Sequence, residues 1–136
     1  MGTRVVAALL AAALLFAACR SSTGPTSTTV NLTAADNGKT QTLHPTDVLV
    51  VTLDSNVTTG FRWELLGKPD ANVLKLQSSE YIAPSTSPGV VGAGGQELWR
   101  FRAVGEGTTT FELTYGRASG ETSGQPFTIT VRVTPA

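Results

Sequence analysis

The sequence predicts an all-β fold, and three observations support this. Runs rich in valine, threonine, leucine and aromatic residues recur along the chain, separated by glycine, proline, asparagine and serine. Most runs alternate apolar and polar residues with the period of a strand, which puts one face on a core. No convincing helical period interrupts them. Together these features indicate an immunoglobulin-like β-sandwich of about seven to eight antiparallel strands, with a small barrel as the alternative architecture.

Seven runs carry the strand pattern. In chain order they are residues 29–33, 47–53, 61–66, 73–82, 96–104, 108–115 and 126–134. The second run is almost wholly apolar, as expected for a strand in the middle of a sandwich. In the third run, Phe61, Trp63 and Leu65 share one face, which we expect to pack on the core. The last three runs repeat this alternation with their own aromatic and branched residues.

Two segments precede this domain. An uncharged apolar run of about a dozen residues follows Arg4 and is too short to span a bilayer comfortably, so residues 1–18 are predicted to be a signal peptide. The small residues before Cys19 resemble a bacterial lipobox, whose cysteine is lipidated and becomes the mature N-terminus. An ordinary signal peptide cut nearby is the alternative. Residues 20–29 are predicted to be a flexible tether, and residues 30–135 the folded domain.

The lipid would hold the protein in the cell envelope, at the periplasmic face of the inner or outer membrane or at the cell surface. Cys19 is the only cysteine, so no internal disulfide can form. Nothing in the sequence demands a partner for folding, and a monomer is expected.

Composition argues against several functions. The chain has ten basic and ten acidic residues, whereas nucleic-acid binding needs a positive excess. The single histidine, His44, stands before Pro45, which indicates a surface turn. One histidine without further cysteine or histidine cannot build a metal site of that kind. No serine stands in a G-x-S-x-G elbow. We therefore expect no catalytic residue, no metal and no cofactor.

The longest connections alternate with short ones. Residues 54–60, 83–95 and 116–125 follow the second, fourth and sixth predicted strands, whereas 67–72 and 105–107 are compact turns. Because consecutive strands of a sandwich run up and down, every second connection lies at the same end. The three long loops should therefore cluster as a binding edge on a rigid scaffold. The alternative is that three long loops share one end by chance.

Each long loop carries a short motif. The first contains NVTTG at residues 56–60, the second VGAGG at residues 91–95, and the third RASG at residues 117–120. In this order and spacing they resemble the chagasin family of cysteine protease inhibitors. That family shows N-P-T-T-G, G-x-G-G and R-P-W or R-P-F on an immunoglobulin-like sandwich. The resemblance extends over roughly residues 30–133.

The resemblance assigns protease binding to ten residues. They are Asn56, Val57, Thr58, Thr59, Gly60, Gly92, Ala93, Gly94, Gly95 and Arg117. Val57 stands where the family has proline, and Ala118 and Ser119 stand where it has proline and an aromatic residue. These departures predict weaker inhibition, or inhibition of fewer proteases, than a member with all three motifs.

The resemblance implies a reversible, competitive inhibitor whose three loops enter the active-site cleft of a papain-like cysteine protease. Small residues with hydroxyls and backbone amides suit the loop that goes deepest. The glycine loop suits main-chain pairing along the substrate groove. The rival hypothesis is a non-inhibitory immunoglobulin-like lipoprotein of the cell envelope, used for adhesion or carbohydrate binding.

Overall fold

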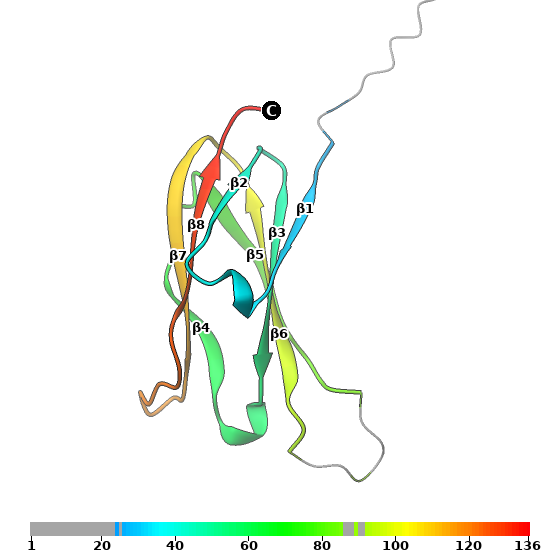
Figure 1. The fold of residues 1–136 in the computed structure, drawn as a ribbon, viewed down its shortest axis with the longest axis vertical. Coiled ribbons are helices and arrows are strands. Elements are labelled where there is room, and N and C mark those ends of the chain that lie inside the picture. Colours follow the sequence, from blue (N-terminus) through cyan, green and yellow to red (C-terminus); the bar gives the residue numbers. More distant parts are fainter. Residues whose placement is uncertain (1–23, 25, 86–88, 90–91) are drawn as a thin grey trace, which may run out of the picture.

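Two four-stranded sheets pack face to face in the computed structural model, which describes residues 24, 26–85, 89 and 92–136 (Figure 1). The strands are β1 (Thr29–Leu32), β2 (Thr40–Leu43), β3 (Val48–Ser55), β4 (Arg62–Gly67), β5 (Leu74–Ile82), β6 (Gly95–Ala103), β7 (Gly107–Gly116) and β8 (Phe127–Val133). One sheet has the order β1-β3-β6-β5 and the other the order β2-β8-β7-β4. The predicted signal peptide, Cys19 and most of the predicted tether lie outside the described residues.

All seven predicted runs form strands, and the sandwich is confirmed. Strand β2 was not predicted, since only Leu43 in it is apolar and buried. The expectation that all strands pair antiparallel is wrong for two pairings: β1 with β3 and β2 with β8 are parallel, whereas the other four pairings are antiparallel. A single chain segment makes both parallel contacts, since it crosses from one sheet to the other through the short 3₁₀ helix η1 (Ala34–Asp36).

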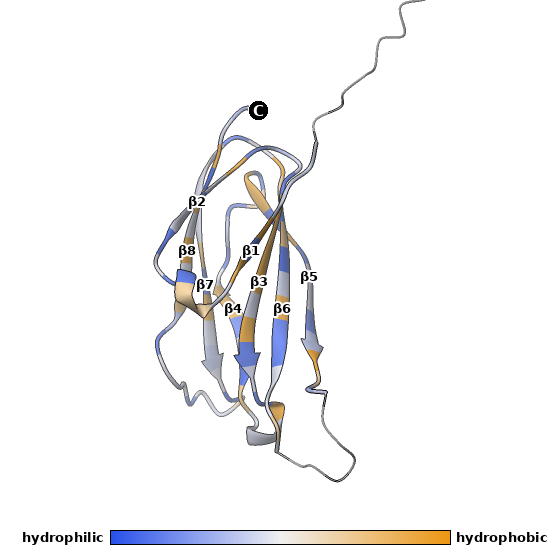
Figure 2. Ribbon diagram, turned by 45° about the vertical axis from the view of Figure 1, so that its right-hand side comes forward, coloured by the Kyte–Doolittle hydropathy of each residue, from blue (hydrophilic) through white to orange (hydrophobic). Residues whose placement is uncertain are grey.

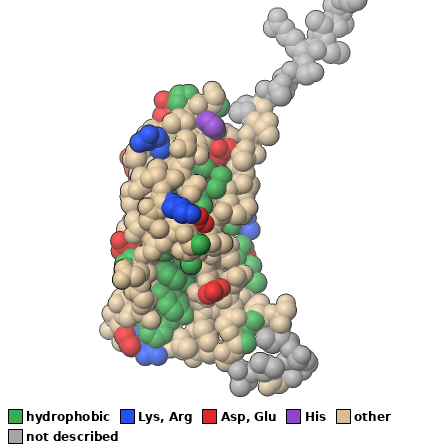
Figure 3. All heavy atoms as spheres, in the orientation of Figure 1, with side chains coloured by type: hydrophobic (Ala, Val, Ile, Leu, Met, Phe, Trp, Pro, Cys, Tyr) green, Lys and Arg blue, Asp and Glu red, His purple; other side chains and the backbone are tan. Residues whose placement is uncertain are grey.

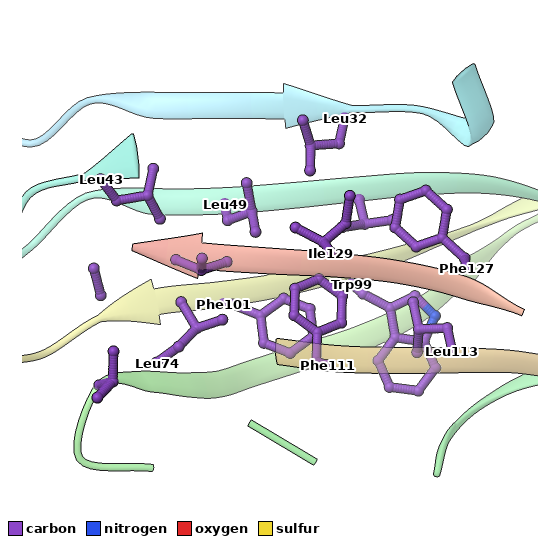
Figure 4. Close-up of a cluster of buried hydrophobic side chains, with 14 of the residues drawn as sticks. Leu32, Leu43, Leu49, Leu74, Trp99, Phe101, Phe111, Leu113, Phe127 and Ile129 are labelled. Atoms are coloured by element: carbon purple, nitrogen blue, oxygen red, sulfur yellow. The ribbon is translucent and has the colours of Figure 1, made fainter. Parts of the chain in front are cut away.

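The core lies between the sheets and is rich in aromatic and branched side chains (Figure 4). Phe101 of β6 and Phe111 of β7 stack at 4.4 Å between ring centroids and join the two sheets. Both are fully buried, as are Leu49 and Ile129. Figure 2 shows hydrophobic and hydrophilic residues alternating along strands such as β6, as expected where one face is buried.

The surface carries few charges. Figure 3 shows Lys, Arg, Asp and Glu side chains scattered over one face, without a continuous patch of one sign. Within the described part of the chain, no helix is long and apolar enough to cross a membrane. The same residues contain no group of three or more histidine, cysteine, aspartate or glutamate side chains placed to hold a metal ion.

Candidate functional site

Three loops lie at one end of the sandwich, which we call the loop end (Figure 1). The first loop, residues 56–61, joins β3 to β4; the second, residues 83–94, joins β5 to β6; and the third, residues 117–126, joins β7 to β8. The first loop is central, with the third loop on one side and the described ends of the second loop, residues 83–85 and 92–94, on the other. The compact turns at residues 68–73 and 104–106 lie at the opposite end, as the up-and-down order of the strands predicts.

The first loop is a single turn of 3₁₀ helix, η2 (Val57–Thr59), which Asn56 caps. The Asn56 side chain accepts a hydrogen bond from the amide of Thr58 at 3.2 Å. Gly60 ends the turn in the left-handed conformation, with φ of 81°, and its amide donates to the carbonyl of Val57. Asparagine before such a turn and glycine after it are the residue types that this geometry favours. The motif therefore specifies the shape of the loop through its first and last residues.

The loop satisfies its own hydrogen-bond donors. The Thr58 hydroxyl donates to the Asn56 side chain, and the Thr59 hydroxyl donates to the Asn56 carbonyl at 2.6 Å. The amides of Thr58, Thr59 and Gly60 also bond within the loop. In the free protein these amides and hydroxyl protons are therefore already bonded within the loop, and their use by a partner stays a prediction. What the exposed tip offers is small side chains and oxygen lone pairs, and burying it leaves none of these donors without a partner.

The second loop is joined to the first by its main chain. The Asn56 side-chain amide donates to the carbonyl of Gly92 at 3.0 Å. Gly94 follows without a side chain, beside the Cβ of Asn56. At Gly95 a Cβ would collide with the carbonyl of Ile82 and the ring of Tyr81, so only glycine lets β6 begin beside β5. At Gly95 the backbone therefore lies in close contact with the neighbouring strand β5 of the same protein. Ala93 lies between these residues and is half-buried.

Arg117 joins the third loop to the first. Its Nε donates to the carbonyl of Thr59 at 3.0 Å, and its guanidinium lies 4.3 Å from the centre of the Phe61 ring. Its Nη1 also contacts Glu121 at 2.8 Å. The predicted binding residue Arg117 therefore holds the first loop from the side. Ala118 and Ser119 form the exposed tip of a tight turn, closed by the Gly120 amide donating to the Arg117 carbonyl.

An aromatic row supports the first loop from behind. Tyr115 lies between Phe61 and Trp63, at centroid distances of 5.3 and 5.0 Å, and its hydroxyl accepts from the amide of Asn56. Trp63 packs against the core, but Phe61 does not, so its expected place in the core is wrong. Phe61 instead lies between Tyr115 and Arg117.

A buried carboxylate, that of Glu97, lies beneath the same loop in a role that was not predicted from the sequence. Oε1 of Glu97 accepts from the Ser55 hydroxyl at 2.7 Å and from the amide of Trp63 at 3.2 Å. It thereby joins the last residue of β3 to the start of β4, on both sides of the first loop. Its position on the core-facing side of β6, in phase with Trp99 and Phe101, was the signal that could have revealed it.

A second polar cluster fixes the opposite end. Asp47 is buried and accepts from the amides of Thr28 and His44, at 2.9 and 2.8 Å. Burial alone would raise the pKa of Asp47, but these hydrogen bonds and the nearby His44 ring hold it below its usual value. His44 lies in an exposed turn, as predicted. Through Thr28, the cluster holds the segment that precedes β1 at the end of the sandwich opposite the loop end.

Comparison with known proteins supports the resemblance to the chagasin family. The chagasin family of peptidase inhibitors, family I42, matches residues 42–133. Chagasin of Trypanosoma cruzi is 32% identical over 90 residues, which is 63% of this chain and 79% of that protein.

Two solved structures share the fold. The cysteine protease inhibitor EhICP2 of Entamoeba histolytica superposes with a TM-score of 0.70 at 23% identity, covering 82% of this chain and all of that one. PbICP-C, solved in complex with falcipain-2, superposes with a TM-score of 0.54 at 19% identity, covering 82% and 93% of the two chains. Sequence, fold and loop motifs agree: this chain belongs to the chagasin family, whose members are peptidase inhibitors and not enzymes.

Proposed function

We propose that this protein is a reversible, competitive inhibitor of papain-like cysteine proteases and that its loop end fills the active-site cleft. The observation that carries the proposal is that side-chain hydrogen bonds connect the three loops. Asn56 bonds Gly92 of the second loop and Arg117 bonds the first loop, so the described parts of the three loops form one preformed surface, which we call the wedge. A preformed surface loses little conformational freedom on binding, which favours affinity.

The central loop has the properties needed to go deepest. Thr58, Thr59 and Gly60 are exposed, uncharged and small, so they fit a narrow cleft without burying a charge. Their donors are already bonded within the loop, which lowers the cost of removing water from them. The second loop would lie along the substrate groove and pair by its main chain, as peptides do in strand addition. No step requires chemistry from the inhibitor.

The third loop favours the rival function of a non-inhibitory envelope module. Ala118 and Ser119 occupy the exposed tip where the family carries proline and an aromatic residue. Losing an aromatic anchor at an interface commonly costs about 1–3 kcal/mol, or roughly ten- to a hundredfold in affinity. The first two loops keep most of their motif residues, with Val57 as the exception, so we propose a weakened inhibitor in preference to an inactive one.

The test is a titration of papain and of a cathepsin-L-like protease with the chain from Arg20 to Ala136. We expect inhibition that raises KM and leaves kcat unchanged, because substrate and inhibitor compete for one cleft. Absence of inhibition at about 50 μM, corresponding to less than about 6 kcal/mol of binding energy, would favour the envelope module.

We also propose that the mature protein is a bacterial lipoprotein anchored through Cys19. The entry of the chain into the sandwich supports this arrangement. Thr29 pairs with Val48 at the end opposite the loops, and the Ser27 hydroxyl donates to the Thr46 carbonyl there. An anchor attached at that end would present the loop end away from the membrane. Cys19→Ser should release the protein to the soluble fraction and abolish palmitate labelling. Unchanged membrane attachment would refute the anchor.

A further inference from the structure

A pocket of about 280 Å³ opens between the two sheets, where the edge strands β4 and β5 meet above β6. We call it the seam pocket. Its lining includes three aromatic side chains, Trp63, Tyr81 and Trp99. It adjoins the wedge: Arg62 of its lining directly follows the first loop, and Tyr81 and Glu97 stand one and two residues from the strand ends at the second loop.

The pocket has an acidic character. Glu64, Glu80 and Glu97 line it, against one basic residue, Arg62. Glu80 is exposed and pairs with Arg100 at 3.7 Å. Glu97 is only 6% exposed and makes no ion pair with any described residue. Its Oε1 is used by Ser55 and Trp63, whereas Oε2 has no hydrogen-bond donor among the described residues. A carboxylate oxygen that lacks a donor at the lining of a pocket is a favourable partner for a cation.

A second observation points to a ligand independently of charge. Trp99 is 7% exposed, it lines the pocket, and its Nε1 has no acceptor among the described residues. Figure 4 shows its indole in the half of the core that contains Leu113 and Phe127, toward the loop end. Buried indole N–H groups normally find an acceptor, so Trp99 holds a donor beside the pocket that no described residue satisfies.

We propose that the seam pocket binds a guanidinium or ammonium group. The cation would donate to Oε2 of Glu97 and contact the faces of the aromatic rings, an arrangement favourable both electrostatically and by cation–π attraction. The group has two sources: a free organic cation, or a lysine or arginine of a protein held by the adjacent loops. The second source rests on the proposed inhibitory function.

The site is tested without any protease, by titrating the protein from Arg20 to Ala136 with ethylguanidinium and following the indole resonance of Trp99 by NMR. The neutral control ligand is ethylurea, which has nearly the same shape. We expect a saturable shift with ethylguanidinium at about millimolar affinity, and none with ethylurea. Equal shifts with both ligands, or no saturation, would overturn the proposal. This comparison needs no variant.

A matched pair of variants locates the site. Glu97→Gln keeps an oxygen for Ser55 and Trp63 but removes the charge, and Glu64→Gln makes the same change on an exposed side chain. We expect Glu97→Gln to weaken ethylguanidinium binding about tenfold or more, and Glu64→Gln to weaken it less than about threefold. Equal binding by wild type and Glu97→Gln would overturn the assignment.

Papain inhibition separates the two sources. If a basic side chain of the protease occupies the pocket, Glu97→Gln weakens inhibition and ethylguanidinium competes with the protease. If both leave inhibition unchanged while ethylguanidinium still binds wild type, the ligand is a free cation. Failure of wild type to inhibit any protease would refute the proposed function and leave the NMR titration unaffected.

Discussion

Arg117→Ala should weaken inhibition although it removes nothing from the tip of the wedge. The side chain makes a hydrogen bond to the Thr59 carbonyl, a cation–π contact with Phe61 and an ion pair with Glu121. A hydrogen bond at a partly exposed site contributes about 1 kcal/mol, and an exposed cation–π contact about 0.5–1 kcal/mol. The ion pair lies at the surface and adds little.

Arg117→Ala should therefore remove about 1–2 kcal/mol of the interactions that hold the first loop in place. This loss corresponds to a roughly 5- to 30-fold higher inhibition constant. The control is Glu121→Gln, which removes only the ion pair and should change the constant less than about twofold. Both constants would be measured by steady-state inhibition of papain.

A direct contact between Arg117 and the protease would give a similar loss, so a second readout is needed. If Arg117 positions the loop, hydrogen exchange at the Gly60 amide should speed up in the free variant, because the turn that protects it loosens. Unchanged exchange in the free protein, with weakened inhibition, would refute the positioning role. Inhibition equal to wild type would refute any role of the side chain.

Three further changes test other parts of the structure. Val57→Pro should stabilise the protein by about 0.4–1 kcal/mol and tighten inhibition a few-fold, since position 57 begins a 3₁₀ turn after an extended residue. Chemical denaturation and inhibition assays measure the two effects, and a lower stability of the variant would contradict the prediction. Ala118→Pro with Ser119→Trp should tighten inhibition about tenfold or more if the third loop docks on the protease, because proline suits the first central position of the turn. Unchanged inhibition would show that this loop does not contact the protease. Asp47→Asn should destabilise the protein at pH 7 by about 1–2 kcal/mol. Because the folded-state pKa of Asp47 is lowered, this contribution is present above the unfolded pKa and is lost as pH falls through the folded pKa, so the two melting temperatures should converge in acid; a constant difference would be the contrary result.

Local pattern was sufficient to predict most of the fold. The alternation in β4, β6, β7 and β8 identifies strands with one buried face, and the lengths of the connections place the three loops together. The strand β2 escaped because Thr40–Leu43 offers one apolar residue and derives its place from pairing with β8, about ninety residues away. Parallel pairing likewise leaves no local signal.

The site was predicted by residue type and only partly by role. The motif indicated Asn56 and Gly60 correctly as loop residues, but not that Asn56 satisfies the threonine donors. Protease binding by Arg117 stays a prediction, whereas its contacts with Thr59 and Phe61, which hold the first loop, were not predicted because they involve a distant segment. Contacts of this kind are set by tertiary structure, which a single sequence does not show.

The central claim is that the loop end enters the protease, and the same substitution at both ends of the sandwich tests it. Thr59→Asp puts a charge at the exposed tip of the first loop, and Ala71→Asp puts one in the exposed turn at the opposite end. Thermal melting would first establish that both variants fold. We predict that Thr59→Asp raises the inhibition constant for papain about 30-fold or more, as expected for burying an unpaired charge, and that Ala71→Asp changes it less than about twofold. Equal effects of the two variants would contradict the account.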